Sequence, residues 1–345
     1  MVYFKNKMMS IISRFHFTKF FIFLFILLVN MKLNAQDKIF VVTTTSIFKD
    51  MIEQLGKNHV LVHSIVPTGS DPHLYEAKPD DVQICKNADL IMINGLHLEV
   101  WIEKLIKNSA AKAPVFLLTN HIKPVKTGKY PDPHAWMSAS NGIIYAKNIA
   151  KAIITINPDL KQVIHSNLEK YIDSLQKLNT YIETEIQKIP ESQKILITNH
   201  DAFRYYGQCY NLKLIPLMGV STEGEPRTSD IIKIIEVIRQ NRVPAIFVET
   251  SINPQQMTQI AADMHISIGG SLFSDSLGES NSSAGTYLGM LKTNTDMIVR
   301  ALYVNTSNQN TKVKIQAFNE IIFISLFLIF LLITTWVFTI KLVNK

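Results

Sequence analysis

Two copies of the tripeptide Asp-Pro-His are the clearest candidates for chemistry in this sequence. They occupy Asp71–His73 and Asp132–His134, and each follows residues typical of turns. A proline fixes its own φ angle and keeps the preceding residue out of the helical region. Each histidine therefore sits on a stiff loop, which suits a metal ligand. An ordinary solvated loop histidine would explain either copy alone, and the repetition leaves the two interpretations evenly matched.

Two further residues lie where strands are expected to end. His200 follows the apolar run Ile195–Thr198, and Asp275 follows the run Ile266–Gly269. In open α/β sheets, ligand sites gather beyond the carboxyl ends of the strands. For Asp275, a helix N-cap or a turn aspartate is the alternative interpretation. Three imidazoles and one carboxylate would suit zinc, and would also accept manganese or iron.

Such a site should also contain polar neighbours that orient its ligands. Neutral imidazoles with one carboxylate leave a divalent ion with a net charge of about +1, so hydrogen-bonded groups nearby should compensate. Glu76, Glu249 and His97 are candidates for that role, and an ordinary polar or structural role is the alternative for each.

The elements that must position these residues alternate between strand and helix. Strands are predicted at Ile39–Thr43, Val60–Val66, Leu90–Asn94, Val115–Leu118, Ile195–Thr198, Lys213–Pro216, Ala245–Val248 and Ile266–Gly269. Helices are predicted at Ile47–Leu55, Leu96–Asn108, Asn141–Ile154, Ser229–Gln240 and Ala284–Tyr303. Strands separated by helices of about ten residues or more indicate βαβ units and mainly parallel sheets. The predicted fold class is therefore α/β.

One long helical pattern interrupts this alternation. Between Pro158 and Pro190, apolar residues recur at helical spacing, and about thirty residues at about 1.5 Å each make a rod of roughly 45 Å. We predict two lobes joined by this rod, with an N-terminal lobe at 36–156, a linking helix at 157–190 and a C-terminal lobe at 191–304. A helix packed within a single domain is the alternative.

Both ends of the chain carry patterns typical of membrane signals. Residues 1–35 are basic around the apolar run Phe20–Val29, which predicts a signal peptide cleaved after Ala35. An uncleaved anchor is the alternative, although this run is too short for a bilayer core of about 30 Å. The uncharged run at 321–340 predicts a C-terminal transmembrane helix after a polar tether at 305–320, with a buried core helix as the alternative.

The net charge of +7 lies in these two ends. Residues 1–35 and 321–345 carry seven basic groups and no acidic group, whereas 36–320 carries 28 of each. The part expected to fold is therefore neutral, which removes the main electrostatic support for nucleic-acid binding.

Cysteine usage argues against a disulfide framework. The sequence has two cysteines, Cys85 and Cys209, far apart and in helix-like stretches. We expect two separate buried thiols, with a single bridge as the alternative.

Seven short stretches, taken together and in order, resemble one known family. The stretches are PTGSDPHLYEAKP (67–79), NADLIMINGLHLEVWIEKL (87–105), DPHAWM (132–137), TNHDAFRYY (198–206), GEPRTSD (224–230), FVETS (247–251) and FSDSLG (273–278). Much of residues 38–304 resembles the periplasmic metal-binding proteins of zinc and manganese ABC transporters. The resemblance implies a metal ion held between two lobes that one long helix joins. Matching motif to motif implies the ligands His73, His134, His200 and Asp275.

The resemblance also implies a function. The expected protein is a monomer that is no enzyme, lies in the periplasm or on the outer face of the cytoplasmic membrane, and passes its ion to an ABC permease. Three imidazoles favour zinc. Manganese-type relatives often have glutamate where His200 stands, and zinc-type relatives often have a His- and Asp-rich loop, which Asn120–Tyr130 lacks, so manganese or iron stays open.

Two other functions would use the same ligands. A membrane-tethered metallohydrolase would need an open coordination position and a general base, for which Glu76 is the candidate, and no HExxH motif is present. In a tethered scaffold domain the metal would be structural, so that its removal would unfold a lobe.

Overall fold

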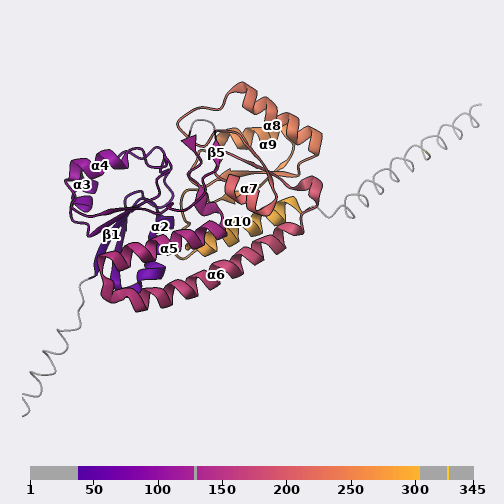
Figure 1. The fold of residues 1–345 in the computed structure, drawn as a ribbon. Coiled ribbons are helices and arrows are strands. Elements are labelled where there is room, and N and C mark those ends of the chain that lie inside the picture. The colour runs from indigo at the N-terminus through magenta and orange to yellow at the C-terminus, as the bar shows by residue number, and fades with distance from the viewer. Residues whose placement is uncertain (1–37, 128–129, 304–324, 326–345) are drawn as a thin grey trace, which may run out of the picture.

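Two α/β lobes lie side by side, and one long helix runs along both of them in this computed structural model (Figure 1). The structure describes residues 38–127, 130–303 and 325. The long helix is α6 (Lys161–Gln187), which is continued at its N-terminal end by the 3₁₀ turn η3 (Pro158–Leu160). The two-lobed α/β prediction is confirmed.

The N-terminal lobe is built on a four-stranded parallel sheet. The strands are β1 (Ile39–Thr43), β2 (Val60–Ser64), β3 (Leu90–Ile93) and β4 (Val115–Leu117), in the order β2-β1-β3-β4. In the register, Val41 pairs with Val62 on one side and with Leu90 on the other. Its helices are α2 (Ser46–Gly56), α3 (Pro79–Lys86) and α4 (Ile102–Ser109), with the 3₁₀ turn η1 (Lys57–His59). Strand β3 is buried along its whole length, as expected for a parallel strand covered on both faces.

The C-terminal lobe contains two parallel strand pairs. They are β7 (Ile195–Thr198) with β8 (Lys213–Pro216), and β9 (Ala245–Glu249) with β10 (Ser267–Leu272). The helices are α7 (Arg204–Tyr210), α8 (Thr228–Asn241), α9 (Gln255–Met264) and α10 (Tyr287–Leu302), with the 3₁₀ turn η4 (Glu191–Gln193). Four elements lie between β4 and η3 along the chain. They are the antiparallel strands β5 (Lys126–Thr127) and β6 (Tyr130–Pro131), the 3₁₀ turn η2 (Ala135–Met137) and α5 (Ala139–Ile156).

A continuous apolar core joins the lobes through the helices beneath them. Helix α6 buries one stripe of side chains, and these pack in one cluster with Val41 from β1 and Leu196 from β7. The stripe is Ile164, Tyr171, Leu175, Leu178, Ile182 and Ile186. Burial of apolar side chains is the main favourable term in folding, so this shared core holds the lobes together.

Two local predictions are wrong. The helix expected from Leu96 begins only at Ile102, because Leu96 and His97 have φ angles of +53° and +65°, which no right-handed helix accepts. The thiols are separate, but only Cys85 is buried, whereas Cys209 is exposed near the end of the short helix α7.

The predicted C-terminal transmembrane helix is also corrected. A span needs about twenty consecutive apolar residues in a helix, and the part of the chain that the structure describes has no helix of that length and apolarity. The run at 321–340 lies outside the described residues except for Ser325, as do the predicted signal peptide at 1–35 and the tether at 305–320. The fold class that the structure supports is the two-lobed α/β arrangement alone.

Candidate metal centre

The structure brings the four predicted ligands to one point between the lobes. His73 lies on the loop after β2, His134 directly precedes η2, His200 follows β7 and Asp275 follows β10. Two ligands therefore come from each half of the fold. One possible ligand atom from each side chain lies within 4.8 Å of the others, and all four residues are buried.

The distances between these atoms match the size of a small cation. His134 Nε2 lies 3.2 Å from His73 Nε2 and 3.3 Å from His200 Nε2. The two carboxylate oxygens of Asp275 lie 3.4 Å from the Nε2 atoms of His134 and His200, respectively. Tetrahedral coordination at bond lengths of about 2.0–2.1 Å places neighbouring ligand atoms about 3.3–3.4 Å apart. The distances around His134, and the distance between Asp275 and His200, are those expected around a small tetrahedral cation.

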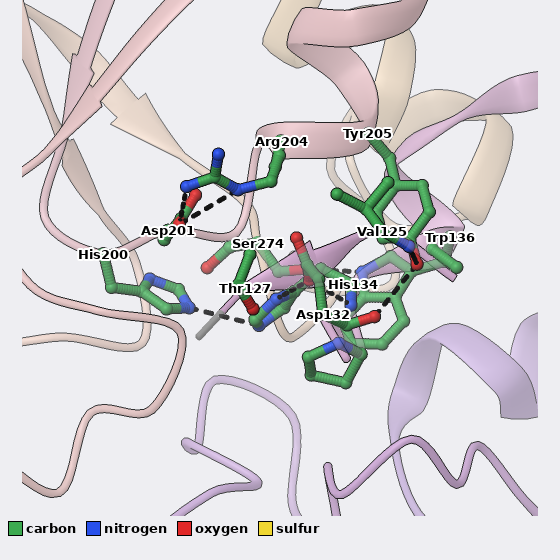
Figure 2. Close-up of polar contacts among 12 residues, drawn as sticks. Val125, Thr127, Asp132, His134, Trp136, His200, Asp201, Arg204, Tyr205 and Ser274 are labelled. Atoms are coloured by element: carbon green, nitrogen blue, oxygen red, sulfur yellow. Dashed lines mark hydrogen bonds and ion pairs between the residues drawn. The ribbon is translucent and has the colours of Figure 1, made fainter. Parts of the chain in front are cut away.

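Carboxylates orient two of the three imidazoles. Asp132 Oδ1 lies 2.8 Å from His134 Nδ1 and also accepts the backbone N–H of His134 at 2.9 Å. Glu249 Oε2 lies 2.7 Å from His200 Nδ1, while its Oε1 accepts the backbone N–H of His200 at 2.8 Å. Figure 2 shows His134 and His200 pointing toward each other, with Asp132 beside His134. A carboxylate on Nδ1 fixes the ring and leaves Nε2 for a metal ion.

Asp275 is the fourth candidate ligand and carries an oxygen without a hydrogen-bond partner. Its Oδ2 accepts a hydrogen bond from Ser274 Oγ at 3.0 Å, while its Oδ1 is buried without a hydrogen-bond partner. Burying an unpaired carboxylate oxygen costs free energy, which a bound cation would offset. The segment is held by Trp136, whose indole Nε1–H donates to the carbonyl of Ser274 at 2.8 Å.

Burial and the neighbouring carboxylates shift the pKa values of the three histidines in different directions. Burial lowers the pKa of His73 to about 3. Burial would also lower the pKa of His134, but the neighbouring carboxylates of Asp132 and Asp275 prevail and raise it to about 10. The pKa of His200 is raised, because Glu249 and Asp275 outweigh the effect of burial. The pKa of Asp275 is lowered, since the surrounding imidazoles outweigh its burial.

Sequence reasoning found only part of the support around the ligands. Of the three candidate orienting residues, Glu249 reaches the candidate ligand His200, whereas Glu76 is exposed. His97 is also exposed, and its ring packs at a tilt against Tyr130 with centroids 4.4 Å apart. Asp132 was not predicted as an orienting residue, although its place in the Asp-Pro-His tripeptide could have indicated that role.

A buried glutamate behind the His134 loop was also missed. Glu99 accepts the backbone N–H of Asn94 at 2.8 Å and the hydroxyl of Thr44 at 2.7 Å. Asn94 Nδ2 in turn donates to the carbonyl of Pro133 at 3.0 Å. These bonds fix the backbone directly before His134. Glu99 lies within the matching stretch 87–105, but nothing in that stretch singled it out, and the segment was wrongly expected to be helical.

Comparison with known proteins identifies the family. The model of the family ZnuA, described as zinc-uptake complex component A, periplasmic, matches residues 41–301. The chain belongs to the ZnuA family. The resemblance seen in the seven motifs is thereby confirmed, and this ZnuA-family chain is a metal-uptake component and not an enzyme.

Individual relatives cover most of the same region. The metal ABC transporter substrate-binding lipoprotein FimA of Streptococcus parasanguinis is 36% identical over 280 residues, which is 78% of this chain and 90% of the relative. The manganese ABC transporter substrate-binding lipoprotein PsaA of Streptococcus pneumoniae is 35% identical over 278 residues, which is 77% of this chain and 90% of the relative. Among solved structures, the periplasmic zinc binding protein TroA from Treponema pallidum superimposes with a TM-score of 0.75 at 31% identity, covering 77% of this chain and all of TroA.

Proposed function

We propose that this protein captures one divalent transition-metal ion between its lobes, with zinc preferred, and passes it to an ABC permease for uptake. The ligands are His73, His134, His200 and Asp275. The observation that carries the proposal is the convergence of three buried imidazoles and one buried carboxylate, whose ligand atoms lie within 4.8 Å of one another. The ion is cargo and undergoes no covalent chemistry.

The donor set supports zinc as the preferred ion. Three imidazoles with one carboxylate suit a borderline cation, and intrinsic affinity rises from manganese to zinc along the divalent series. Relatives are named for both metals, since PsaA is called a manganese protein and TroA a zinc binding protein. Manganese and iron are the competing cargoes.

The place of action in this proposal is outside the cytoplasm. The family description is periplasmic, and the named relatives are substrate-binding lipoproteins of ABC transporters. We propose export by the signal peptide at 1–35, action in the periplasm or at the outer face of the cytoplasmic membrane, and work as a monomer. The lobe boundaries 36–156, 157–190 and 191–304 belong to the same proposal.

Elemental analysis with competitive zinc and manganese titration of the purified protein tests the function. We expect one equivalent of metal, tighter binding of zinc than of manganese, and a strong loss of affinity in His200→Ala. His165→Ala is the matched control, because His165 is an exposed histidine on α6 and its loss should leave affinity unchanged. Unchanged affinity in His200→Ala would refute the ligand assignment.

Thermal unfolding of the metal-free protein separates cargo from a structural metal. The carrier proposal expects a folded metal-free protein with a cooperative transition. Loss of a folded lobe on metal removal would instead support the scaffold alternative.

A further inference from the structure

Asp71 connects the His73 loop to the opposite lobe. Its Oδ1 accepts the backbone N–H of His73 at 2.8 Å, and its Oδ2 accepts the hydroxyl of Thr222 at 2.6 Å. Thr222 lies on the loop 219–227, between β8 and α8 in the C-terminal lobe. Among the hydrogen bonds described for this loop, the bond to Asp71 is the one that crosses to the N-terminal lobe. One carboxylate therefore holds both a ligand's backbone and the loop that faces it.

The loop 219–227 lies beside His73 between two cavities. A cavity of about 160 Å³ is lined by His73 together with Val220 and Ser221. A second cavity of about 330 Å³ is lined by Asp71, Thr222 and, on its other side, Ser251. The hydroxyl of Ser251 donates to the ligand Asp275 at 3.4 Å. Open space thus reaches the site on both sides of this loop.

His73 is the least enclosed of the four ligands. Its exposed fraction is 7%, compared with 0% for His134 and His200 and 1% for Asp275. Within the described residues, no carboxylate oxygen lies within 4.0 Å of its ring nitrogens, whereas Asp132 lies beside the Nδ1 of His134 and Glu249 beside the Nδ1 of His200. An imidazole that no carboxylate holds can change its orientation at a lower cost in free energy.

We propose that Asp71 is a positioning residue, which links the position of loop 219–227 to that of His73 by hydrogen bonding to both. In this proposal, the metal ion enters and leaves the site on the side of His73. The Thr222–Asp71 hydrogen bond holds the loop against the site and slows release. This inference rests on the proposed function, because it concerns the residence time of the captured ion.

The test is the rate constant for zinc dissociation from the full-length protein, followed by chelator competition. Thr222→Val keeps the side-chain shape and removes the hydroxyl, and we expect release to be about tenfold faster, the loss typical of a hydrogen bond to a charged group. Thr222→Ser keeps the hydroxyl and should release zinc within about twofold of the wild type. Asp71→Ala removes both hydrogen bonds and should release zinc faster than Thr222→Val.

Two further readouts separate positioning from general stability. In the metal-free protein, Thr222→Val should speed amide exchange of residues 219–227 while leaving the unfolding midpoint unchanged. Glu223→Ala is the matched control, because this exposed neighbour on the same loop has no contact with Asp71 and should release zinc at the wild-type rate.

The outcomes are distinct. Wild-type release rates in both Thr222→Val and Asp71→Ala would overturn the proposal, as would a Thr222→Ser protein that releases zinc as fast as Thr222→Val. A wild-type protein that fails to bind zinc, manganese or iron would refute the proposed function instead.

Discussion

The two Asp-Pro-His loops share a sequence and a backbone conformation but differ in what surrounds their histidine rings. In both, the aspartate Oδ1 accepts the backbone N–H two residues later, at 2.8 Å for Asp71 and 2.9 Å for Asp132. This Asx-type turn is local and follows from the tripeptide. Asp132 Oδ1 also lies 2.8 Å from the ring Nδ1 of His134, whereas the second oxygen of Asp71 bonds Thr222 of the other lobe.

The same tripeptide thus presents one candidate ligand whose ring is held by a carboxylate and another whose ring is not. His134 is fully buried and lies within 3.4 Å of atoms of the other three ligands. His73 lies at the edge of the site and is held through its backbone. We therefore expect the two loops to respond unequally to equivalent substitutions.

The largest expected effect is the loss of the central histidine. His134→Ala should lower zinc affinity by about two to three orders of magnitude, because a protein zinc site with a binding free energy of about 10–16 kcal/mol shares it among four ligands. His73→Ala should lose about tenfold less than this, since water can occupy its position at the edge of the site. Competitive titration measures both losses of affinity, and equal losses would contradict the difference inferred between the two loops.

An intermediate effect is expected when the two aspartates are changed to asparagine. Asp132→Asn should lower zinc affinity by about 10–100-fold, the range typical of a lost carboxylate partner of a ligating histidine. Asp71→Asn should cost less than about threefold, because the amide can still accept the backbone N–H of His73 and donate to Thr222. The same titration measures the pair, and a larger loss in Asp71→Asn would contradict the assigned roles.

The last expected effect is a pH dependence of zinc affinity that distinguishes the rings. A ligating imidazole must be neutral, and the pKa of about 10 at His134 means that this ring is protonated at pH 7 in the metal-free protein. Zinc affinity should therefore rise with pH, by about tenfold per pH unit for each proton displaced, until the pH passes the pKa of His134. His73, with a pKa of about 3, is already neutral and adds no such dependence.

Calorimetry in buffers of different ionisation enthalpy counts the protons released on binding. At least one proton per zinc ion is expected near pH 7. Binding without proton release, together with an affinity that does not change between pH 6 and 8, would contradict the assigned protonation of His134.

The sequence predicted the fold best where local patterns suffice. Strands β7 and β8 begin and end at the expected residues, because each is a short apolar run between turn-forming residues. The segment at 96–101 was missed because two non-glycine residues there adopt left-handed φ angles that local propensity does not indicate. The long helix was recognised from the spacing of residues such as Leu175 and Leu178.

At the site, local sequence marked candidate ligands, which the structure brings together, but gave little information on their partners. The repeated tripeptide and the position of His200 after a strand marked candidates, and the resemblance selected the set of four. The pairing of Asp71 with Thr222 joins residues 151 positions apart, and that of His200 with Glu249 joins residues 49 positions apart. The first contact depends on how the two lobes face each other, and the second on how β7 and β9 lie side by side within the C-terminal lobe. No short motif records either arrangement.

The most direct measurement is zinc-edge anomalous diffraction from crystals of the zinc-loaded protein. A single strong peak is predicted, about 2.0–2.2 Å from the Nε2 atoms of His73, His134 and His200 and from a carboxylate oxygen of Asp275. A peak bound elsewhere, or one that leaves two or more of these four side chains outside bonding distance, would contradict a carrier that encloses its ion between two lobes.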